Sequence, residues 1–282
     1  LKKNVKLFIN TWHGGGCYKK FNVFFQDNLL FKKRMKYRAK ITDVAISSCK
    51  SFSESNKNHW YMAEEKFFPI GMPRVDFLIN NFQNVELITK IKSELKIPQN
   101  KKIILYAPTF RGVLSGMNAP RQTKMLLDIP NVLKAISKKF SQSFVILYRA
   151  HQSMLGENIF FDGMIDVSHY DDAQKILLVT DVLITDYSSI IWDFSFLNRP
   201  CFLFTPDLEQ YKKENGFFTP IEKWPFDYAV SNSDLILSIE KFDISSCKKR
   251  LQEHHKTLGS YETGKATQAI FDYIKNDCPK KT

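Results

Sequence analysis

A histidine followed by three glycines is the first group in this sequence that could do chemistry. Thr11-Trp12-His13 is followed by Gly14-Gly15-Gly16, directly after the apolar run at residues 5–9. Glycine lets backbone N–H groups approach a ligand closely, and open α/β sheets bind ligands at the carboxyl ends of parallel strands. We therefore expect a ligand-binding loop that includes His13 and Gly14.

The letters His-Gly-Gly-Gly also occur in the oxyanion loop of esterases. That chemistry requires a Gly-x-Ser-x-Gly nucleophile elbow. The nearest string, at residues 112–116, has the wrong spacing. The esterase interpretation is therefore disfavoured, while a structural turn with an incidental histidine stays open as an alternative.

A second polar group follows the apolar run at residues 182–185. Asp186-Tyr187-Ser188-Ser189 lies between this expected strand and an expected helix. A serine there can cap the helix, and the free N–H groups of a helix start attract anions. Two hydroxyls after Asp-Tyr exceed what one cap requires, so phosphate binding is favoured over capping alone.

Cationic residues follow two further expected strands. Thr109-Phe110-Arg111 comes after residues 103–107, and Arg149-Ala150-His151 after residues 144–148. If the strands are parallel, these side chains and the serines share one rim, which is typical of a diphosphate site. The sequence lacks Gly-x-Gly-x-x-Gly and Gly-Lys-Ser/Thr loops, so a dinucleotide oxidoreductase and a P-loop nucleotidase lose their main support.

The elements that must position these residues alternate along the chain. Short β-rich runs alternate with helical patterns, which predicts βαβ units and parallel sheets. The fold class is therefore α/β. The expected strands are residues 5–9, 44–47, 103–107, 144–148, 182–185 and 201–204, and the expected helices include residues 129–140, 172–180, 189–197 and the broken stretch 244–274.

The segment at residues 67–73, with two prolines and a glycine, is the expected domain junction. Residues 1–68 would form the C-terminal part of an acceptor-side Rossmann-like domain. Residues 69–282 would form a nucleotide-binding Rossmann-like domain whose C-terminal helices pack back. Two or three strands are too few for a complete first domain, so we expect the chain to be a fragment of a longer enzyme.

Composition narrows the class of protein. With 44% hydrophobic residues, the 282-residue chain can bury one large or two modest cores, which excludes disorder. Five widely spaced cysteines without a Cys-x-x-Cys pair fit a reducing compartment. The longest apolar stretch, residues 176–184, is far too short to cross a bilayer.

The formal net charge of +12 is unevenly spread, since residues 1–70 hold 14 basic and 5 acidic side chains. The run from Lys32 to Lys40 follows an apolar stretch and could meet an anionic bilayer or a phosphate polymer, or be a solvated face. Nucleic acid is not expected as a partner, because no nucleic-acid module accompanies the run. His254-His255 and His59 lack partners at metal-ligand spacing and are expected to be solvated.

Several short sequence segments, in their order along the chain, resemble the CDP-glycerol:poly(glycerophosphate) glycerophosphotransferases of teichoic acid synthesis and their capsule-polymerase relatives. The resemblance covers roughly residues 5–240, and it is densest around Asp186. The segments are Thr11-Trp12-His13-Gly14, Ile70-Gly71-Met72-Pro73-Arg74-Val75-Asp76, and residues 104–111, 147–151, 181–189, 192–194, 198–200 and 207–211.

This resemblance implies a GT-B-like pair of Rossmann-type domains, with the donor held mainly by the second. It implies a peripheral enzyme on the cytoplasmic face of the membrane, without metal or cofactor. The chain departs from the family pattern at Gly15-Gly16 instead of Thr-Pro, at Gln152 instead of Pro, and at residues 214–218, which lack an Arg-Gly pair. These departures leave open which donor alcohol and acceptor are used.

The reaction implied by the resemblance is transfer of glycerol phosphate, or a related polyol phosphate, from a CDP-alcohol to a hydroxyl of a membrane-linked polymer or primer, with release of CMP. His13 would be the general base, because imidazole titrates near neutral pH. Asp186 would orient His151 or contact the nucleotide, and Asp193 would serve the ribose or pair with Arg199. The predicted catalytic residues are His13 and His151, and the predicted substrate-binding residues are Gly14, Thr109, Arg111, Arg149, Asp186, Tyr187, Ser188, Ser189 and Asp193.

Two other functions stay open on the sequence alone. A GT-B glycosyltransferase using a nucleotide sugar would share the fold and the diphosphate site. A non-catalytic nucleotide-binding module of a larger capsule enzyme would bind the donor and transfer nothing.

Overall fold

The computed structural model describes residues 6–20, 28–109, 127–150 and 163–276, and the chain forms two compact units. The first unit comprises residues 1–82, 209–224 and 249–282, and the second comprises residues 83–208 and 225–248. Each unit has its own parallel sheet, which confirms the predicted α/β class.

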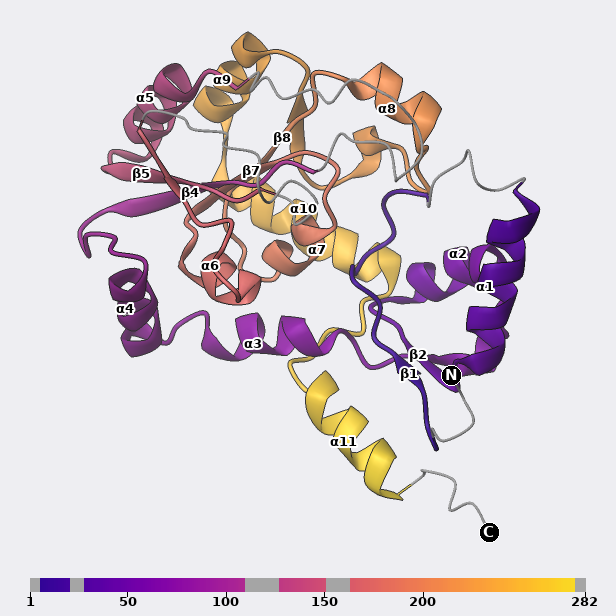
Figure 1. The fold of residues 1–282 in the computed structure, drawn as a ribbon. Coiled ribbons are helices and arrows are strands. Elements are labelled where there is room, and N and C mark those ends of the chain that lie inside the picture. The colour runs from indigo at the N-terminus through magenta and orange to yellow at the C-terminus, as the bar shows by residue number, and fades with distance from the viewer. Residues whose placement is uncertain (1–5, 21–27, 110–126, 151–162, 277–282) are drawn as a thin grey trace. The chain divides into compact units, whose positions relative to one another are not determined.

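The first unit is built on a three-stranded sheet in the order β1-β2-β3. The middle strand is buried along its length, because α1 and α2 connect it to its neighbours as parallel crossovers. Figure 1 shows α1 and α2 lying together beside this sheet. The elements are β1 (Ile9–Asn10), α1 (Leu29–Ile41), β2 (Val44–Ile46), α2 (Lys50–Trp60), β3 (Phe67–Phe68), α3 (Pro73–Asn81), α8 (Leu208–Glu214), α11 (Ala266–Asn276) and the larger part of α10 (Ile244–Leu258), whose residues up to 248 belong to the second unit.

The second unit holds a six-stranded parallel sheet in the order β6-β5-β4-β7-β8-β9. Helices α5 and α9 lie on one face of the sheet, and α6 and α7 lie on the other (Figure 1). The elements are α4 (Val85–Glu94), β4 (Lys102–Tyr106), α5 (Ile129–Phe140), β5 (Phe144–Tyr148), β6 (Met164–Asp166), α6 (Ala173–Val179), β7 (Val182–Thr185), α7 (Ile190–Ser195), β8 (Cys201–Phe204), β9 (Asp227–Ala229) and α9 (Asn232–Lys241).

The long elements of the second unit match the sequence-based expectations. Strands β5, β7 and β8 have the predicted bounds, and α5 spans the predicted residues 129–140. Helix α5 begins there because Asp128 accepts a hydrogen bond from the Asn131 backbone N–H and Pro130 occupies the first turn. The predicted break in the C-terminal helical stretch lies between α10 and α11.

The predicted division of the chain after residue 68 differs from the compact units. Helix α3 lies after that point but groups with the first unit, where Asp76 accepts hydrogen bonds from the Ala266 and Thr267 backbone N–H groups at 3.0 and 2.7 Å and so caps α11. The assignment of residues 1–68 to an acceptor-side domain and of residues 69–282 to a nucleotide-binding domain stays a prediction.

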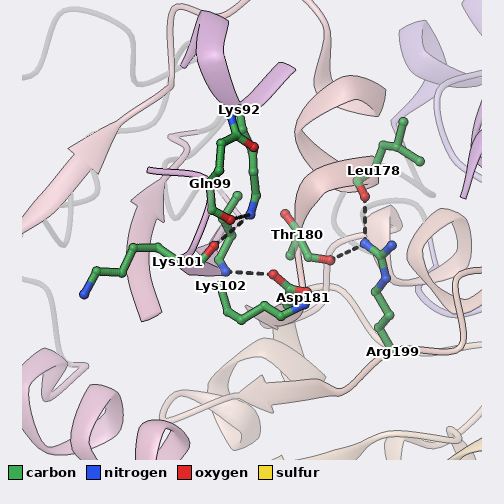
Figure 2. A network of polar contacts seen from close by, with 9 residues as sticks. Lys92, Gln99, Lys101, Lys102, Leu178, Thr180, Asp181 and Arg199 are labelled. Atoms are coloured by element: carbon green, nitrogen blue, oxygen red, sulfur yellow. Dashed lines mark hydrogen bonds and ion pairs between the residues drawn. The ribbon is translucent and has the colours of Figure 1, made fainter. Parts of the chain in front are cut away.

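A polar network holds the amino ends of β4 and β7 together (Figure 2). The Asp181 carboxylate accepts from Lys102 Nζ at 3.0 Å and from the Ile103 backbone N–H at 2.9 Å. Arg199 Nη1 donates to the carbonyls of Leu178 and Thr180 at 2.7 and 2.6 Å, at the end of α6. Burial lowers the pKa of Arg199, partly offset by Asp181. This network braces the sheet at the edge opposite the strand ends that carry the predicted site.

Candidate active site

The strand order of the second sheet reverses between β4 and β7. From β4 the chain continues to β5 and β6 on one side, and then it crosses to β7, β8 and β9 on the other side. In open α/β sheets, ligands bind outside the carboxyl ends of the strands at such a switch point. The segments that leave this point are those that carry Thr109 and Asp186, so the topology selects the same segments as the sequence.

The Asp186 carboxylate is bound directly to Thr109 across the switch point. It accepts from the Thr109 backbone N–H at 2.9 and 3.1 Å, through its two oxygens, and from the Thr109 hydroxyl at 2.8 Å. Asp186 is 1% exposed. A buried carboxylate with several donors holds its partners firmly, because leaving it unsatisfied is costly. Asp186 therefore fixes the backbone that leaves β4, and its predicted contact with His151 or the nucleotide stays a prediction.

Arg149 follows β5 and is also used to hold a neighbouring segment. Its Nη1 donates to the carbonyls of Val167 and Tyr170 at 2.9 and 2.8 Å. Burial lowers the pKa of Arg149, and the nearby Asp172 and Asp171 oppose that shift. This guanidinium thus fixes the segment that follows β6, and its role in diphosphate binding stays a prediction.

The serine pair lies at the carboxyl end of β7, between the strand and α7. Ser188 Oγ accepts from the Ile190 backbone N–H at 3.4 Å, while Ser189, at the cap position, makes no side-chain capping bond. Both residues are half-buried. Ser188 therefore makes a local hydrogen bond at the start of α7. The contact of both serines with phosphate stays a prediction.

Tyr187 and Asp193 are buried inside the second unit. The Tyr187 hydroxyl donates to Asp207 Oδ1 at 3.0 Å, and Asp193 Oδ2 accepts from Gln174 Nε2 at 3.1 Å. Arg199, which the sequence offered as a structural partner of Asp193, donates to the carbonyls shown in Figure 2. Both buried residues therefore have structural contacts within the unit, and their predicted substrate contacts stay predictions.

Two residues with predicted roles in the site, Arg111 and His151, lie outside the described residues. Their predicted roles stay predictions. The remaining candidates divide between the units, since His13 and Gly14 belong to the first and the others to the second.

In the first unit, the loop after β1 is held in an unusual backbone conformation. Trp12 has a φ of 53°, a region that bulky residues rarely adopt, and its N–H donates to Asn10 Oδ1 at 3.0 Å. The Trp12 ring lies 4.4 Å from the His13 ring and 4.4 Å from the Trp60 ring. Gly14 is buried, and His13 is exposed. This loop presents the imidazole at the carboxyl end of β1 with Trp12 packed beside it.

Sequence reasoning missed two residues that position the histidine loop. Arg74 Nη1 donates to the His13 carbonyl at 2.5 Å, and Ser48 Oγ accepts from the Gly16 backbone N–H at 3.0 Å. Arg74 stands in the Gly-x-Pro-Arg-x-Asp string at residues 71–76, which is one of the motifs that carry the family resemblance. The sequence shows the motif that contains Arg74, but it does not show that Arg74 binds the His13 carbonyl, 61 residues away.

The structure explains why this motif has a glycine at residue 71. Gly71 has a φ of +85°, and an added Cβ would lie 2.6 Å from Glu262 Oε2. The same Glu262 oxygen accepts from the Met72 backbone N–H at 2.8 Å. The segment at residues 71–76 thus joins the C-terminal part of the chain to the His13 loop.

Replacing Arg74 with alanine is expected to lower kcat about tenfold while KM for the donor changes less than about twofold. The reason is that the lost bond positions the His13 backbone in the first unit, while the donor is expected to bind in the second. Steady-state kinetics of Arg74→Ala and Arg74→Lys would check this, with partial recovery expected for lysine, which can donate one bond. Equal changes in kcat for both variants with a large rise in donor KM would contradict a positioning role.

His254 was expected to be solvated, and this prediction was wrong. The side chain is buried, its Nε2 lies 3.1 Å from the Tyr18 hydroxyl, and the two rings stack. Burial and the neighbouring His255 lower the pKa of His254 to about 4, so it is neutral at pH 7. Over the described ranges, no group of three or more His, Cys, Asp or Glu side chains could hold a metal ion, and no helix is long and apolar enough to cross a membrane.

Comparison with known proteins identifies related chains. The family model described as CDP-Glycerol:Poly(glycerophosphate) glycerophosphotransferase matches residues 1–276. The chain is 29% identical to the teichoic acid poly(glycerol phosphate) polymerase of Staphylococcus epidermidis, over 98% of this chain and 40% of that protein. It is 28% identical to the teichoic acid ribitol-phosphate primase of Bacillus spizizenii, over 98% of this chain and 71% of that protein. The chain therefore spans less than half of the Staphylococcus epidermidis polymerase.

Solved structures show the same fold. The wall teichoic acid polymerase TagF superposes with a TM-score of 0.82 at 28% identity, over 99% of this chain and 69% of that one. A histidine variant of TagF soaked with CDPG matches with a TM-score of 0.79 at 29% identity, over 99% of this chain and 70% of that one. These matches confirm the predicted GT-B-like pair of parallel sheets.

Proposed function

Because the chain belongs to the CDP-Glycerol:Poly(glycerophosphate) glycerophosphotransferase family, we propose that it transfers a polyol phosphate from a CDP-alcohol to a hydroxyl of a membrane-linked polymer or primer, releasing CMP. The observation that best supports this proposal is the match of residues 1–276 to the family. The donor alcohol is glycerol or ribitol, since relatives of both kinds match the chain over most of its length.

The proposed reaction is a substitution at the phosphorus that carries the polyol. The acceptor oxygen forms a bond to this phosphorus, and the bond from phosphorus to the bridging oxygen breaks. The electron pair of the broken bond leaves with CMP, and the acceptor proton passes to His13. An exposed imidazole beside a glycine loop at the end of β1 suits this task, because it can accept a proton near neutral pH.

The second unit is the proposed donor side. Asp186 and Thr109 brace the switch point between β4 and β7, where open α/β sheets bind nucleotides. Arg111, Arg149, His151, Ser188 and Ser189 would offset the negative charge on the diphosphate and on the departing CMP. The proposed activity requires no metal or cofactor.

The proposed place of action is the cytoplasmic face of the membrane, with the protein bound peripherally. The cations between Lys32 and Lys40 on α1 support this location, because a basic helix is attracted to anionic lipid or to a phosphate polymer. The proposed partners are the CDP-alcohol donor, the polyol-phosphate or lipid-linked acceptor, and the anionic membrane surface.

The reaction class can be tested by measuring CMP release from the full-length protein given a lipid-linked primer and CDP-glycerol, CDP-ribitol or UDP-sugars. We expect release of CMP with one CDP-alcohol, dependent on the primer, and thermal stabilisation of the protein by cytidine nucleotides only. Consumption of a UDP-sugar would instead support a glycosyltransferase. Stabilisation by a CDP-alcohol without any CMP release would support a non-catalytic binding module.

A further inference from the structure

The first unit contains a cavity that none of the predicted catalytic or substrate-binding residues lines. Its volume is about 660 Å³, and it lies among β1, α1 and the end of α2. This volume is in the range of small-molecule binding sites in proteins. The cavity borders the histidine loop through Trp12, whose ring packs against His13 at 4.4 Å.

Part of the lining of this cavity is apolar and buried. Met35 and Met62 are each 6% exposed, Trp60 is 3% exposed, and the Trp12 ring packs against Trp60 at 4.4 Å. Side chains of this kind favour a ligand that brings hydrocarbon out of water, and methionine adapts to flexible chains. A fully polar ligand such as a free polyol phosphate would leave this lining without matching groups.

Two arginines on one face of α1 also line the cavity. Arg34 and Arg38 are four residues apart, so their side chains lie on the same side of the helix, and both are exposed. A guanidinium group binds phosphate oxygens in a bidentate way and remains charged at any physiological pH. The cavity thus combines an apolar interior with cations that match an anionic headgroup.

The same helix combines exposed apolar residues at its start with many cations along its length. Leu29 and Leu30, at its start, are 73% and 71% exposed, and lysines surround the two arginines along the helix. Clustered cations are attracted to an anionic bilayer surface, and exposed leucines beside them add apolar area that can leave water there. The charge and the exposed leucines of α1 lie on the helix that lines the cavity.

We propose that this cavity binds one acyl chain of an anionic phospholipid, whose phosphate is held by Arg34 and Arg38. The lipid would fix the first unit on the bilayer with the Trp12–His13 pair beside it. The proposal gives the proposed membrane partner a defined binding site. It can be tested without any transfer reaction, so its failure is distinguishable from a failure of the proposed function.

The test uses the full chain and titration calorimetry with monomeric dodecyl phosphate, inorganic phosphate and dodecyl maltoside as probes. We expect dodecyl phosphate to bind at least tenfold more tightly than either of the other two. The double variant Arg34→Gln/Arg38→Gln should lose at least tenfold in affinity for dodecyl phosphate. The double variant Lys33→Gln/Lys40→Gln, which removes the same charge from exposed positions outside the cavity lining, should stay within twofold.

A variant that fills the cavity tests whether the acyl chain binds inside it, independently of the attraction between phosphate and surface cations. Ala39 lines the cavity and is 5% exposed, so Ala39→Phe places a ring inside it without changing the charge. If this variant unfolds, Thr11→Trp narrows the cavity from an exposed position. We expect the folded variant to lose at least tenfold in affinity for dodecyl phosphate and to bind less to vesicles of phosphatidylglycerol and phosphatidylcholine.

Three results would overturn the proposal. One is wild-type affinity for dodecyl phosphate in the folded cavity-filling variant. Another is equal loss in the two charge variants, which would indicate general surface attraction. The third is equal affinity for inorganic phosphate and dodecyl phosphate, which would indicate a phosphate site without a chain pocket.

Discussion

Replacing His13 with alanine is expected to lower the rate of CMP release at least about 1000-fold, while the affinity for CDP-glycerol changes less than about twofold. General-base catalysis contributes on the order of 100- to 10,000-fold, and the donor is proposed to bind in the second unit, where His13 makes no contribution. Primer-dependent CMP release and calorimetric donor binding, measured on the same preparation, check the two parts separately.

The matched control is His59→Gln, on α2 in the same unit, where the ring packs edge-on against Phe218 at 4.9 Å. We expect this variant to keep wild-type turnover. The rate of the native enzyme should fall as the pH drops below the pKa of the base, because a protonated imidazole accepts no proton. Near wild-type turnover of His13→Ala would show that another group removes the acceptor proton.

Replacing Asp186 with alanine is expected to have the second-largest effect, on both stability and donor binding. The change removes the acceptor of the Thr109 N–H and hydroxyl and leaves a partly buried N–H without its partner. Hydrogen bonds to a charged group contribute about 1.5–3 kcal/mol each, so losing the bonds from the Thr109 N–H and hydroxyl should lower the free energy of unfolding by about 3–6 kcal/mol. Because the backbone leaving β4 borders the proposed donor site, KM for the CDP-alcohol should rise at least about tenfold.

Urea unfolding and steady-state kinetics measure these two effects, and Thr109→Val provides the graded control. Valine removes only the hydroxyl bond and keeps the backbone N–H bond, so about 1.5–3 kcal/mol of stability should be lost, which is about half of the loss in Asp186→Ala. A loss of stability in Asp186→Ala with an unchanged donor KM would leave Asp186 a purely structural role. No change in either quantity would contradict the bonding described at the switch point.

Sequence patterns were sufficient to predict some strands and insufficient for others. Strands β5, β7 and β8 were predicted with their observed bounds because their residues form apolar runs between turn signals. Strands β3, β6 and β9 were missed, since each has two or three residues, too few to show a periodicity. Strands β1 and β2 are as short, but the sequence marks them by the longer runs at residues 5–9 and 44–47. Such short strands form because they pair with a neighbouring strand, as β6 does with β5. This pairing depends on the tertiary structure.

For the candidate site, the sequence identified residue types and their positions at strand ends. It could not identify partners, because partners are distant in the chain. The bond from the Asp186 carboxylate to Thr109, 77 residues away, could not be read from the sequence, while the expected action of Asp186 on His151 or the nucleotide stays a prediction. Arg74 was given no role, although it donates to the His13 carbonyl.

The sequence by itself determined the α/β class, the parallel strands, the order of the motifs and the family. These properties follow from the alternation of apolar and polar residues and from short sequence motifs. Both involve residues that are close together in the chain. Only the tertiary structure decided that the strand order reverses between β4 and β7, that His254 is buried, and that Arg34 and Arg38 line a cavity. The physical reason is that strand order, burial and cavities depend on which segments pack together in space, and spacing along the chain does not specify that packing.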